Sequence, residues 1–367
     1  MKFALLFAAD AAVAFASSEH DGKRLIRLSA DHSEWMTDAQ VADLALRDIG
    51  FLDDTDGEWT RVLELGAARQ AQKSTLQGRA LQEATPYPIV ATYPKLKQSL
   101  ERFVNKFANR LYNSTEGAQS CGWIYGQVTE LAATVVTNPD VKVNYSVLAR
   151  VEPTTIVKDD IVILSAHQDS INRKDRRDIV KRKNAPGADD DGSGTVTILE
   201  SLKYLLATPE WTPIRPVEFH WYAAEEVGKF GSLAVVAEYA NASTAVLAQM
   251  QQDMTGYVAP GTRPVVNFIS DFTNKNLNTF VETLIATYLG LPVNHSACGY
   301  GCSDHFSWNA SGYPSTYPFE TELKDLNPYM HSQNDTIDTI DFNHMADFTK
   351  LSIAYVVELT QDSATSC

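Results

Sequence analysis

The stretch DIVILSAHQD (residues 160–169) joins an unbroken apolar run to a histidine and an aspartate. A continuous apolar run of this length is typical of a strand that is covered by protein on both faces. The polar residues follow at the carboxyl end of the predicted strand, where open α/β sheets place their functional sites. This stretch therefore predicts both a fold class and the position of a site.

Strand-like and helix-like segments alternate around this stretch. Apolar residues with helical spacing predict helices at residues 96–112, 194–208, 232–240, 277–289 and 344–360. Apolar runs predict further strands at residues 217–224, 246–252, 264–270 and 315–319. The alternation predicts an α/β fold with three layers, α/β/α, around a largely parallel, mixed central sheet. We expect it to form a single catalytic domain over residues 85–367.

The N-terminal part of the chain has a different character. Residues 1–18 have a short basic start, an apolar stretch and small residues at the end, which are features of a secretory signal peptide. Asp10 interrupts the apolar stretch, and a short buried helix is the alternative. Residues 19–80 are polar, and their apolar residues have helical spacing with no strand-like apolar run. This pattern favours a propeptide that ends between residues 75 and 90. A helical subdomain that stays attached is the alternative to this propeptide.

The composition favours an acidic, soluble protein, and the predicted signal peptide favours secretion. The net charge of −15 argues against nucleic acid as a partner, because phosphate binding requires a basic face. No later run approaches the ~18 apolar residues that a membrane span requires, and we expect a monomer. Export would allow glycosylation at the N-x-S/T sequons. These lie at Asn113, Asn144, Asn241, Asn294 and Asn309, and at Asn334, which we expect to stay unmodified because His331 is close.

Four cysteines are present, and two of them lie in the motif CGYGC (residues 298–302). Cys298 and Cys302 are close enough for a short-loop disulfide, or they could remain two reduced thiols. The predicted signal peptide favours the disulfide, since disulfides persist in oxidising compartments. The sequence leaves open whether Cys121 and Cys367 pair.

Polar residues of the types that bind metals follow three of the predicted strands. His167 and Asp169 follow the first, Glu225 and Glu226 the second, and Asp253 the third. The carboxyl ends of parallel strands meet at one edge of a sheet, so these side chains are expected to lie close together. Two loops add further candidates, APGADDDGSG (residues 185–194) and MHSQNDT (residues 330–336).

The triplet Asp189–Asp191 precedes a glycine-rich turn and a predicted helix. A turn of this kind can bind phosphate, but three carboxylates would repel it in the absence of a metal. Helix capping explains one aspartate and leaves two unexplained. One histidine and one carboxylate for each ion, together with a shared carboxylate, would be enough to hold a pair of zinc ions with a position open for water. His167, His331, Glu226, Asp253 and one aspartate of the triplet supply that set.

Six motifs occur in an order that resembles a known family. They are HxD after an apolar strand, PGADDDGSG, AAEEVGxxGS, QQDMTGY, CGYGCSDH and MHSQNDT. Together, over residues 96–360, they resemble the co-catalytic dizinc aminopeptidases, the secreted leucine aminopeptidases of bacteria and fungi. The resemblance implies the zinc-peptidase type of α/β fold and two Zn²⁺ per chain. It also implies a zymogen with a leader and a pro-region.

The resemblance also implies the role of each site residue. The implied metal ligands are His167, Asp190, Glu226, Asp253 and His331, with Asp190 bridging. Asp169 matches a carboxylate that orients His167, Glu225 matches the general base, and Tyr300 matches a hydroxyl that stabilises the oxyanion. The same motif gives Cys298–Cys302 as a disulfide. The implied reaction is hydrolysis of the first peptide bond by a zinc-activated water, with Glu225 moving the proton.

The family has an apolar pocket for the first residue of the substrate. The matching positions in this chain are Met254, Ile269, Phe319, Leu323 and Leu326. They predict leucine or another apolar residue at the substrate N-terminus, although each could be an ordinary core residue.

One segment departs from the family pattern. Residues 171–184, INRKDRRDIVKRKN, carry seven Lys and Arg residues in an acidic protein. They are either an exposed loop without a role or a surface that attracts acidic peptides or the C-terminal carboxylate of short ones.

Other functions remain as alternatives. A carboxypeptidase, a deacylase or a glutaminyl cyclase-like enzyme could use similar ligands. A non-catalytic binding domain would be expected to lack a ligand or the base, and none is missing. A nucleotide-binding domain would place phosphate beside Asp189–Asp191, which is electrostatically unfavourable.

Overall fold

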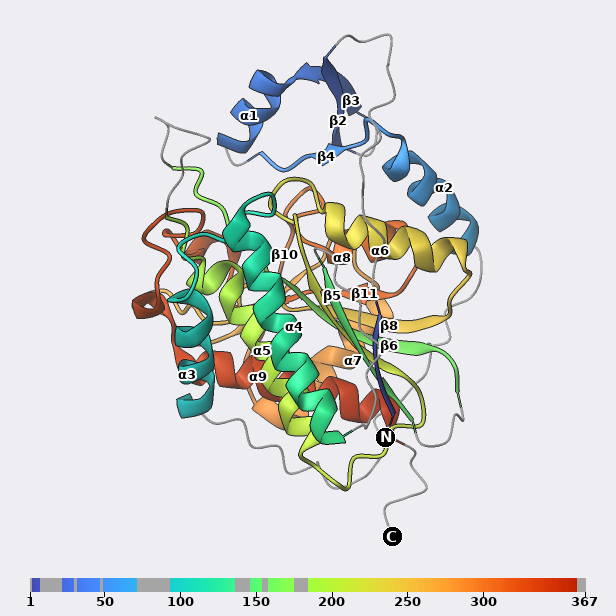
Figure 1. The fold of residues 1–367 in the computed structure, drawn as a ribbon, viewed down its shortest axis with the longest axis vertical. Helices are drawn as coiled ribbons and strands as arrows, with labels where there is room; N and C mark the ends of the chain where they lie inside the picture. The colour runs from blue at the N-terminus through green and yellow to red at the C-terminus, as the bar shows by residue number, and fades with distance from the viewer. Residues whose placement is uncertain are drawn as a thin grey trace.

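The computed structural model describes residues 2–6, 22–29, 32–46, 49–70, 93–135, 146–153, 158–174 and 184–361. Its centre is a six-stranded sheet in the order β1-β5-β7-β6-β8-β11 (Figure 1). The strands are β1 (Lys2–Leu6), β5 (Val147–Glu152), β7 (Val217–Tyr222), β6 (Ile161–His167), β8 (Val246–Gln251) and β11 (Ser315–Thr316). Strands β7, β6, β8 and β11 are parallel, whereas β5 and β1 are antiparallel to their neighbours. The predicted mixed, largely parallel sheet is confirmed.

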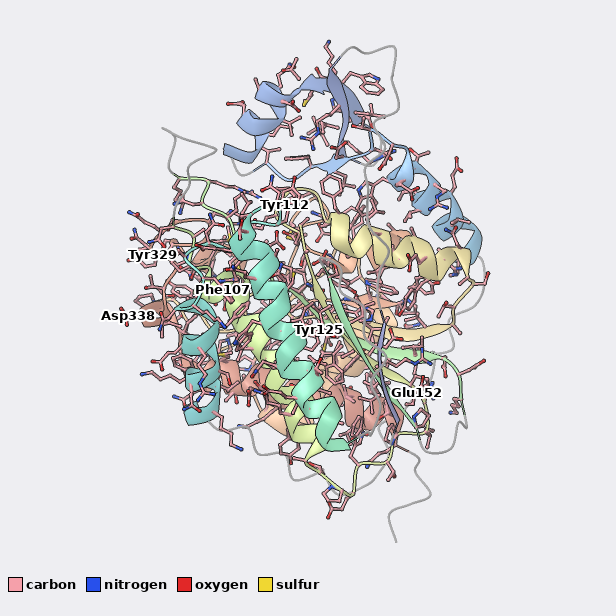
Figure 2. The ribbon with its side chains drawn as sticks, viewed as in Figure 1. Phe107, Tyr112, Tyr125, Glu152, Tyr329 and Asp338 are labelled. Atoms are coloured by element: carbon pink, nitrogen blue, oxygen red, sulfur yellow. A yellow bond between two sulfur atoms is a disulfide. The ribbon has the colours of Figure 1, made fainter. Side chains whose placement is uncertain are left out.

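Helices cover both faces of this sheet and form two hydrophobic cores, which side chains fill (Figures 1 and 2). The first core lies against α3 (Tyr93–Val104), α4 (Thr115–Val135), α5 (Gly194–Leu206), α7 (Lys275–Leu284) and α9 (Phe342–Thr360). The second lies against α6 (Phe230–Asn241) and α8 (His305–Ala310). Strand β6 contributes Val162 and Leu164 to the first core and Ile161 and Ile163 to the second. Its unbroken apolar run thus reflects burial on both faces.

Two segments that were predicted as strands of the central sheet lie partly or wholly outside it. The run at 264–270 becomes β9 (Val266–Ile269), which pairs with β10 (Val293–Ser296) outside the central sheet. The run at 315–319 is divided, because β11 joins the central sheet while β12 (Pro318–Phe319) pairs with β9. Pro318 has no backbone N–H, so the run could not continue as a fully paired central strand. Tyr317 lies between the two pieces and is buried.

The helix predicted at 96–112 ends at Val104, where α3 stops. The residues that follow carry apolar and basic side chains at helical spacing, but they form an irregular segment that packs inward. Phe107 and Arg110 are buried, and the Arg110 guanidinium donates to backbone carbonyl groups of Gln168 and Gly187. Tertiary contacts therefore override the local helical pattern. Helix α4 and strand β5 were not predicted.

Residues 22–70 form a small unit of their own, and the expectation that this region lacks strands is wrong. Strands β3 (His32–Thr37), β2 (Lys23–Ser29) and β4 (Leu52–Asp53) form an antiparallel sheet, joined by α1 (Asp38–Leu46) and followed by α2 (Glu58–Gln70). Basic residues interrupt the apolar pattern of β2, because Arg24 and Arg27 pair with Asp53 and Asp54 across the sheet. The boundary expected between residues 75 and 90 lies outside the described residues.

Most of the predicted signal peptide also lies outside the described residues, apart from β1. Strand β1 lies at the edge of the central sheet beside β5, in register from Lys2 with Glu152 to Leu6 with Leu148. Among the helices that the structure describes, none has the length and apolar character needed to cross a membrane.

Helix α2 attaches the N-terminal unit to the rest of the chain. Trp59 and Val62 are fully buried in the second core, and the Trp59 ring lies 5.2 Å from that of Phe306. Arg69 donates to the carbonyl of Ser311 at 3.0 Å. Gly66 approaches α8 so closely that an added β-carbon would lie 1.7 Å from the carbonyl oxygen of Ala310. The two elements can pack at this distance only because position 66 has no side chain.

Replacing Gly66 with valine should force α2 away from α8 and loosen the N-terminal unit. We expect Gly66→Val to be cut within α2 (Glu58–Gln70) by a low protease concentration at least several-fold faster than the wild type. Ala67→Val is the matched control, since Ala67 is exposed on the same helix. Equal cleavage rates for the two variants would contradict this packing.

Candidate metal and catalytic site

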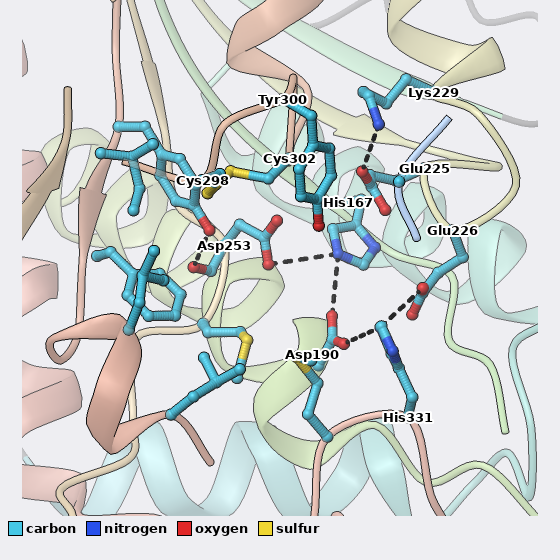
Figure 3. A pocket seen from close by; sticks show the side chains of 18 of the residues that line it. His167, Asp190, Glu225, Glu226, Lys229, Asp253, Cys298, Tyr300, Cys302 and His331 are labelled. Atoms are coloured by element: carbon cyan, nitrogen blue, oxygen red, sulfur yellow. Dashed lines mark hydrogen bonds and ion pairs between the residues drawn. A yellow bond between two sulfur atoms is a disulfide. The ribbon is translucent and has the colours of Figure 1, made fainter. Parts of the chain in front are cut away.

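The five predicted metal ligands come together at the carboxyl end of the sheet and line one pocket (Figure 3). His167 ends β6, Glu226 and Asp253 follow β7 and β8, Asp190 lies in a helical turn at Ala188–Ser193, and His331 lies in the loop before α9. His331 is partly buried and the other four are buried. Their ligand atoms lie in two groups: His167 and Asp253 lie together with Asp191, and His331 and Glu226 lie together with Asp190.

Asp190 lies between the two histidines. Its Oδ1 is 3.2 Å from Nε2 of His167, and its Oδ2 is 2.9 Å from Nε2 of His331. Burial acts to raise the pKa of the Asp190 carboxyl, but His331 and His167 hold that pKa well below its usual value. One carboxylate oxygen thus faces each group of ligands, which is the arrangement that a bridging ligand requires.

The three consecutive aspartates have three different environments. Asp191 accepts hydrogen bonds from the backbone N–H groups of His167, Gly194 and Met254, at 3.0, 2.9 and 3.1 Å. Asp189 accepts from the side chain of Asn327 at 2.7 Å, and burial raises its pKa to about 6. Asp191 also lies within reach of His167 and Asp253, but backbone donors already occupy its oxygens. Asp190 is the member whose oxygens face the pocket (Figure 3).

Asp169 connects His167 to the pair of glutamates. Its Oδ1 lies 3.5 Å from Nδ1 of His167. The same carboxylate accepts from the backbone N–H groups of Glu225 and Glu226, at 3.2 and 3.3 Å. Orientation of His167 was expected from the sequence, whereas the contact with the glutamate turn was not. One buried side chain therefore fixes the relative positions of a ligand and of the turn after β7.

Glu225 and Glu226 point to different partners. Oε2 of Glu226 lies 3.0 Å from Nε2 of His331, and burial raises the pKa of Glu226 to about 7. Oε1 of Glu225 lies 3.5 Å from Nζ of Lys229. Burial raises the pKa of Glu225, while Lys229 opposes the rise. Glu225 is not in either group of ligand atoms.

Two residues behind the site were missed in the sequence. Asp335 is buried and accepts from the backbone N–H groups of Asp189 and Asp190, each at 3.0 Å. Ser303 donates to Oδ2 of Asp253 at 2.5 Å. Both residues lie inside recognised motifs, MHSQNDT and CGYGCSDH, but only the folded backbone shows what they contact.

Arg110 places a positive charge beneath the carboxylates. It is fully buried, and burial lowers its pKa to about 10 while Asp335, Asp191, Asp169 and Asp190 oppose that shift. An uncompensated group of buried carboxylates would be strongly destabilising. Arg110 therefore offsets part of the negative charge that the site concentrates.

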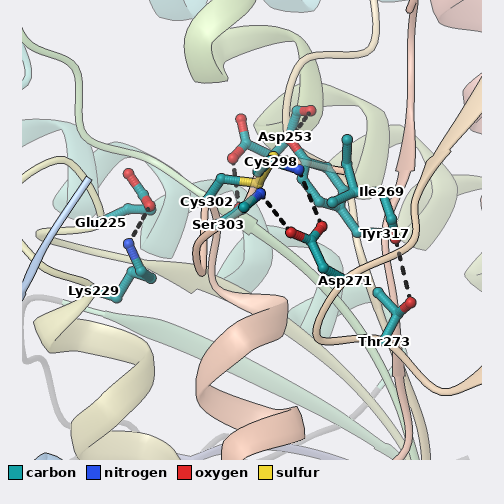
Figure 4. Close-up of a disulfide and its surroundings, with 11 residues drawn as sticks. Glu225, Lys229, Asp253, Ile269, Asp271, Thr273, Cys298, Cys302, Ser303 and Tyr317 are labelled. Carbon is teal, nitrogen blue, oxygen red and sulfur yellow. Dashed lines mark hydrogen bonds and ion pairs between the residues drawn. A yellow bond between two sulfur atoms is a disulfide. The ribbon is translucent and has the colours of Figure 1, made fainter. Parts of the chain in front are cut away.

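Tyr300 is held above the pocket by the loop that Cys298 and Cys302 close. The predicted disulfide between these cysteines is present in the structure. Asp271 accepts from the backbone N–H groups of Cys298 and Gly299, at 3.1 and 2.6 Å (Figure 4). Figure 3 shows the Tyr300 hydroxyl directed toward His167. Cys121 is buried in the first core, and Cys367 lies outside the described residues, so their pairing stays open.

The predicted apolar positions form one wall of the same pocket. Met254, Ile269 and Phe319 are buried, with Leu323 and Leu326 packed against them. Tyr317 and Met330, which were not predicted, complete this cluster. The wall lies on the disulfide side of the pocket (Figure 4).

Unusual backbone angles are concentrated at the site. Ala224, Lys229, Met254 and His331 all have positive φ angles, between 55° and 61°. Such angles cost free energy in residues other than glycine, and they persist only where the surroundings impose them. Each of these residues is next to or within the set of functional side chains.

The basic segment at 171–184 is described only at its ends. Arg173 lines the pocket, and its Nη2 donates to the carbonyl oxygen and to Oε2 of Glu226, at 2.7 and 3.1 Å. Lys174 donates to the carbonyl of Pro328 at 2.7 Å. Residues 175–183 lie outside the described part of the chain, so the predicted attraction for acidic peptides stays a prediction.

The residues present fit zinc. Carboxylate oxygens and imidazole nitrogens converge from five residues, and Oε1 of Glu226 is buried without a hydrogen-bond partner among the described residues. Zinc prefers such a set of N and O ligands. The excess of carboxylates over cations in the pocket also favours a divalent ion, whose charge would offset theirs.

Comparison with known proteins supports the same assignment. The model of Peptidase family M28 matches residues 146–356. "Leucine aminopeptidase 1" of Penicillium rubens is 35% identical over 364 residues, covering 92% of this chain and 90% of that protein. The crystal structure of the LapA aminopeptidase of Legionella pneumophila superposes with a TM-score of 0.74 at 26% identity, covering 93% of this chain and 98% of that one. LapB of the same organism gives a TM-score of 0.73, also at 26% identity, covering 93% and 100%.

The family model covers the strands and loops that carry the site, and the relative and the two solved structures each cover more than nine-tenths of the chain. They confirm the resemblance inferred from the six motifs. The chain therefore belongs to peptidase family M28.

Proposed function

We propose that this chain is a secreted aminopeptidase that uses two zinc ions to remove an N-terminal leucine or another apolar residue from peptides. The observation that carries the proposal is the position of Asp190 between His167 and His331, beside Glu225 and an apolar wall. The aminopeptidase activity is inferred from the names of the relatives. The role of each residue is inferred from the geometry of the site.

One zinc ion would be held by His167 and Asp253, the other by His331 and Glu226, and Asp190 would be shared. Zinc bound in this way lowers the pKa of water and withdraws electron density from a carbonyl group. Asp169 keeps the His167 ring oriented, as expected of a carboxylate beside a metal-binding histidine. Asp335 fixes the backbone from which the Asp190 side chain projects.

Glu225 is the general base in this proposal. Burial raises its pKa, so that it can accept a proton from water and then donate it to the leaving amine. The Tyr300 hydroxyl would donate a hydrogen bond to the oxygen on which negative charge develops. The substrate α-amino group would lie among the carboxylates, which confines cleavage to the first residue.

The apolar wall explains the preference for the first side chain. Met254, Ile269 and Phe319 form a buried surface that offers a leucine side chain contacts in place of water. A charged side chain there would lose its hydration without gaining a partner on this wall.

Replacing Glu225 with glutamine should remove the base and keep the shape of the pocket. We expect Glu225→Gln to lower kcat for leucine-p-nitroanilide about 10²–10⁴-fold, with zinc content unchanged by metal analysis. Glu226→Gln should lose zinc as well as activity. Normal turnover by Glu225→Gln would refute the mechanism.

A panel of leucyl, glutamyl and C-terminal-leucine substrates separates the aminopeptidase from the carboxypeptidase, deacylase and cyclase alternatives.

Replacing Asp335 should weaken zinc binding without touching a ligand. In Asp335→Asn, one acceptor oxygen becomes an NH₂ group that faces a backbone N–H, so the Asp189–Asp190 turn loses an anchor. We expect zinc affinity to fall about 10- to 100-fold, measured by competition with a chelator. Asp338→Asn is the control, because Asp338 is exposed at the edge of the molecule (Figure 2). Equal zinc affinity in both variants would contradict the anchoring role.

We further propose that residues 19–80 are a propeptide whose Ile49–Phe51 segment covers the site. Ile49, Gly50 and Phe51 line the same pocket as the metal ligands. A β-carbon added at Gly50 would lie 1.9 Å from Cε2 of Tyr300. The segment thus lies against Tyr300, the residue proposed to donate a hydrogen bond to the oxyanion. A peptide substrate could reach the Tyr300 hydroxyl only after the segment leaves the pocket.

A larger residue at position 50 should drive this segment out of the pocket. We expect Gly50→Leu to raise leucine-p-nitroanilide turnover of the uncut chain several-fold, toward the activity that follows cleavage between residues 75 and 90. Ser33→Leu is the control, because Ser33 is exposed in the same unit. If the uncut wild type is already as active as the cleaved protein, the segment does not block the site.

Secretion and glycosylation stay proposals. Among the sequons, Asn113 and Asn241 are exposed and could carry glycans. Asn294 and Asn309 are half-buried, and the Asn294 amide donates to Glu322 at 3.1 Å. Asn144 lies outside the described residues. We propose a monomer that acts on peptides with a free N-terminus, without nucleic acid or a membrane as a partner.

A further inference from the structure

Lys229 is a buried lysine that the reaction described above does not use. It lines the pocket, and its side chain is only 5% exposed. The sequence places it four residues after Glu225, in AAEEVGKFGS, at a position that the motif leaves open. Lysine is rarely buried to this extent unless its charge has a function or a partner.

The backbone directs this side chain into the pocket. The N–H group of Lys229 donates to the carbonyl of Glu225 at 3.0 Å, which closes a turn. Lys229 itself has a φ angle of 61° and precedes the first residue of α6. A lysine in this left-handed conformation is strained, and it is maintained here by the closed turn and the start of the helix.

The pocket has two chemically different ends. Figure 4 shows Lys229 and Glu225 on one side of Asp253 and the disulfide, and Ile269 and Tyr317 on the other side. Figure 3 likewise separates Lys229 from Cys298, with Tyr300 and Cys302 between them. If the first side chain of the substrate occupies the apolar wall, as proposed above, then the residue after the scissile bond lies toward Lys229.

Lys229 retains the capacity to bind an anion. An ammonium group has three N–H donors, and the contact that the structure gives for Nζ is Oε1 of Glu225, at the long distance of 3.5 Å. The neighbouring cation Arg173 is already bound to Glu226 through two contacts. The N-terminal unit lies beside this end, since the segment that includes Asp53 packs next to Gly228.

We propose that Lys229 is a specificity-determining residue that binds a carboxylate on the residue after the scissile bond. This inference rests on the proposed aminopeptidase function and identifies a second determinant of its substrates. The carboxylate is either the C-terminus of a dipeptide or an acidic side chain at the second position. Both place the same anion next to a buried ammonium, where a charge-assisted hydrogen bond is strong because water is excluded.

The test compares substrates that differ by one charge. The enzyme purified from the culture medium is assayed with Leu-Gly against Leu-Gly-amide for the C-terminal carboxylate. Leu-Asp-amide against Leu-Asn-amide tests the acidic side chain. We expect the wild type to favour the anionic member of at least one pair by about tenfold in kcat/KM, as expected for one hydrogen bond to a charged group. The pair that shows the preference identifies the source of the carboxylate.

Variants of Lys229 then assign the preference. Lys229→Met should bring the ratio of kcat/KM values within that pair close to one, while Lys229→Arg should keep most of it. Lys350→Met is the matched control on α9, outside the residues that line the pocket. A purely structural effect on Glu225 would lower kcat for all four substrates and leave the ratios unchanged, which would overturn the proposal. Ratios of kcat/KM near one for both substrate pairs in the wild type would also overturn the proposal. If the wild type hydrolyses no leucyl substrate at all, the proposed aminopeptidase function itself is refuted.

Discussion

Buried negative charge is the constraint on which this structure depends. Asp190, Glu226, Asp253 and Glu225 are all buried within one pocket, beside Asp169 and Asp191. Carboxylates are rarely buried without partners, because each loses its hydration. The protein offsets part of this cost with cations, namely Arg110 beneath the carboxylates and Arg173 and Lys229 at the rim. The remaining excess of negative charge is what makes the pocket suited to divalent ions.

Aspartates that bind backbone N–H groups hold the loops that carry the site. Asp169 holds the glutamate turn, Asp335 holds the turn of Asp190, and Asp271 holds the loop of Tyr300. In each case one carboxylate accepts from two consecutive N–H groups, so the direction of a short loop is fixed as well as its position. Preorganisation of this kind matters for catalysis, since a displacement of about 1 Å can cost roughly 10²-fold in rate.

Much of the site was predictable because it depends on order along the chain. Strand ends place their next residues at one edge, so His167, Glu226 and Asp253 could be grouped from the sequence alone. Asp190 could be chosen within its triplet only by family resemblance, since its two neighbours differ from it in their backbone contacts and not in residue type. Arg110 was assigned to a helix, because nothing local marks a side chain that is required at a distant site. Strand β2 was missed because its basic residues pair with Asp53 and Asp54, which lie 29 and 27 residues away in the sequence.

The N-terminal unit contacts both the second hydrophobic core and the pocket that holds the predicted metal ligands. Trp59 and Val62 complete the second core, while Ile49–Phe51 line the pocket about ten residues earlier in the chain. The same docking that buries apolar surface on α6 and α8 therefore positions a backbone segment against Tyr300. Glycine at positions 50 and 66 permits both approaches, since a β-carbon at either position would overlap the neighbouring atoms. In the proposed propeptide, the core contacts of α2 and the contacts of Ile49–Phe51 with the pocket both come before residue 75 in the chain. A single cut between residues 75 and 90 would therefore allow both sets of contacts to leave the site together.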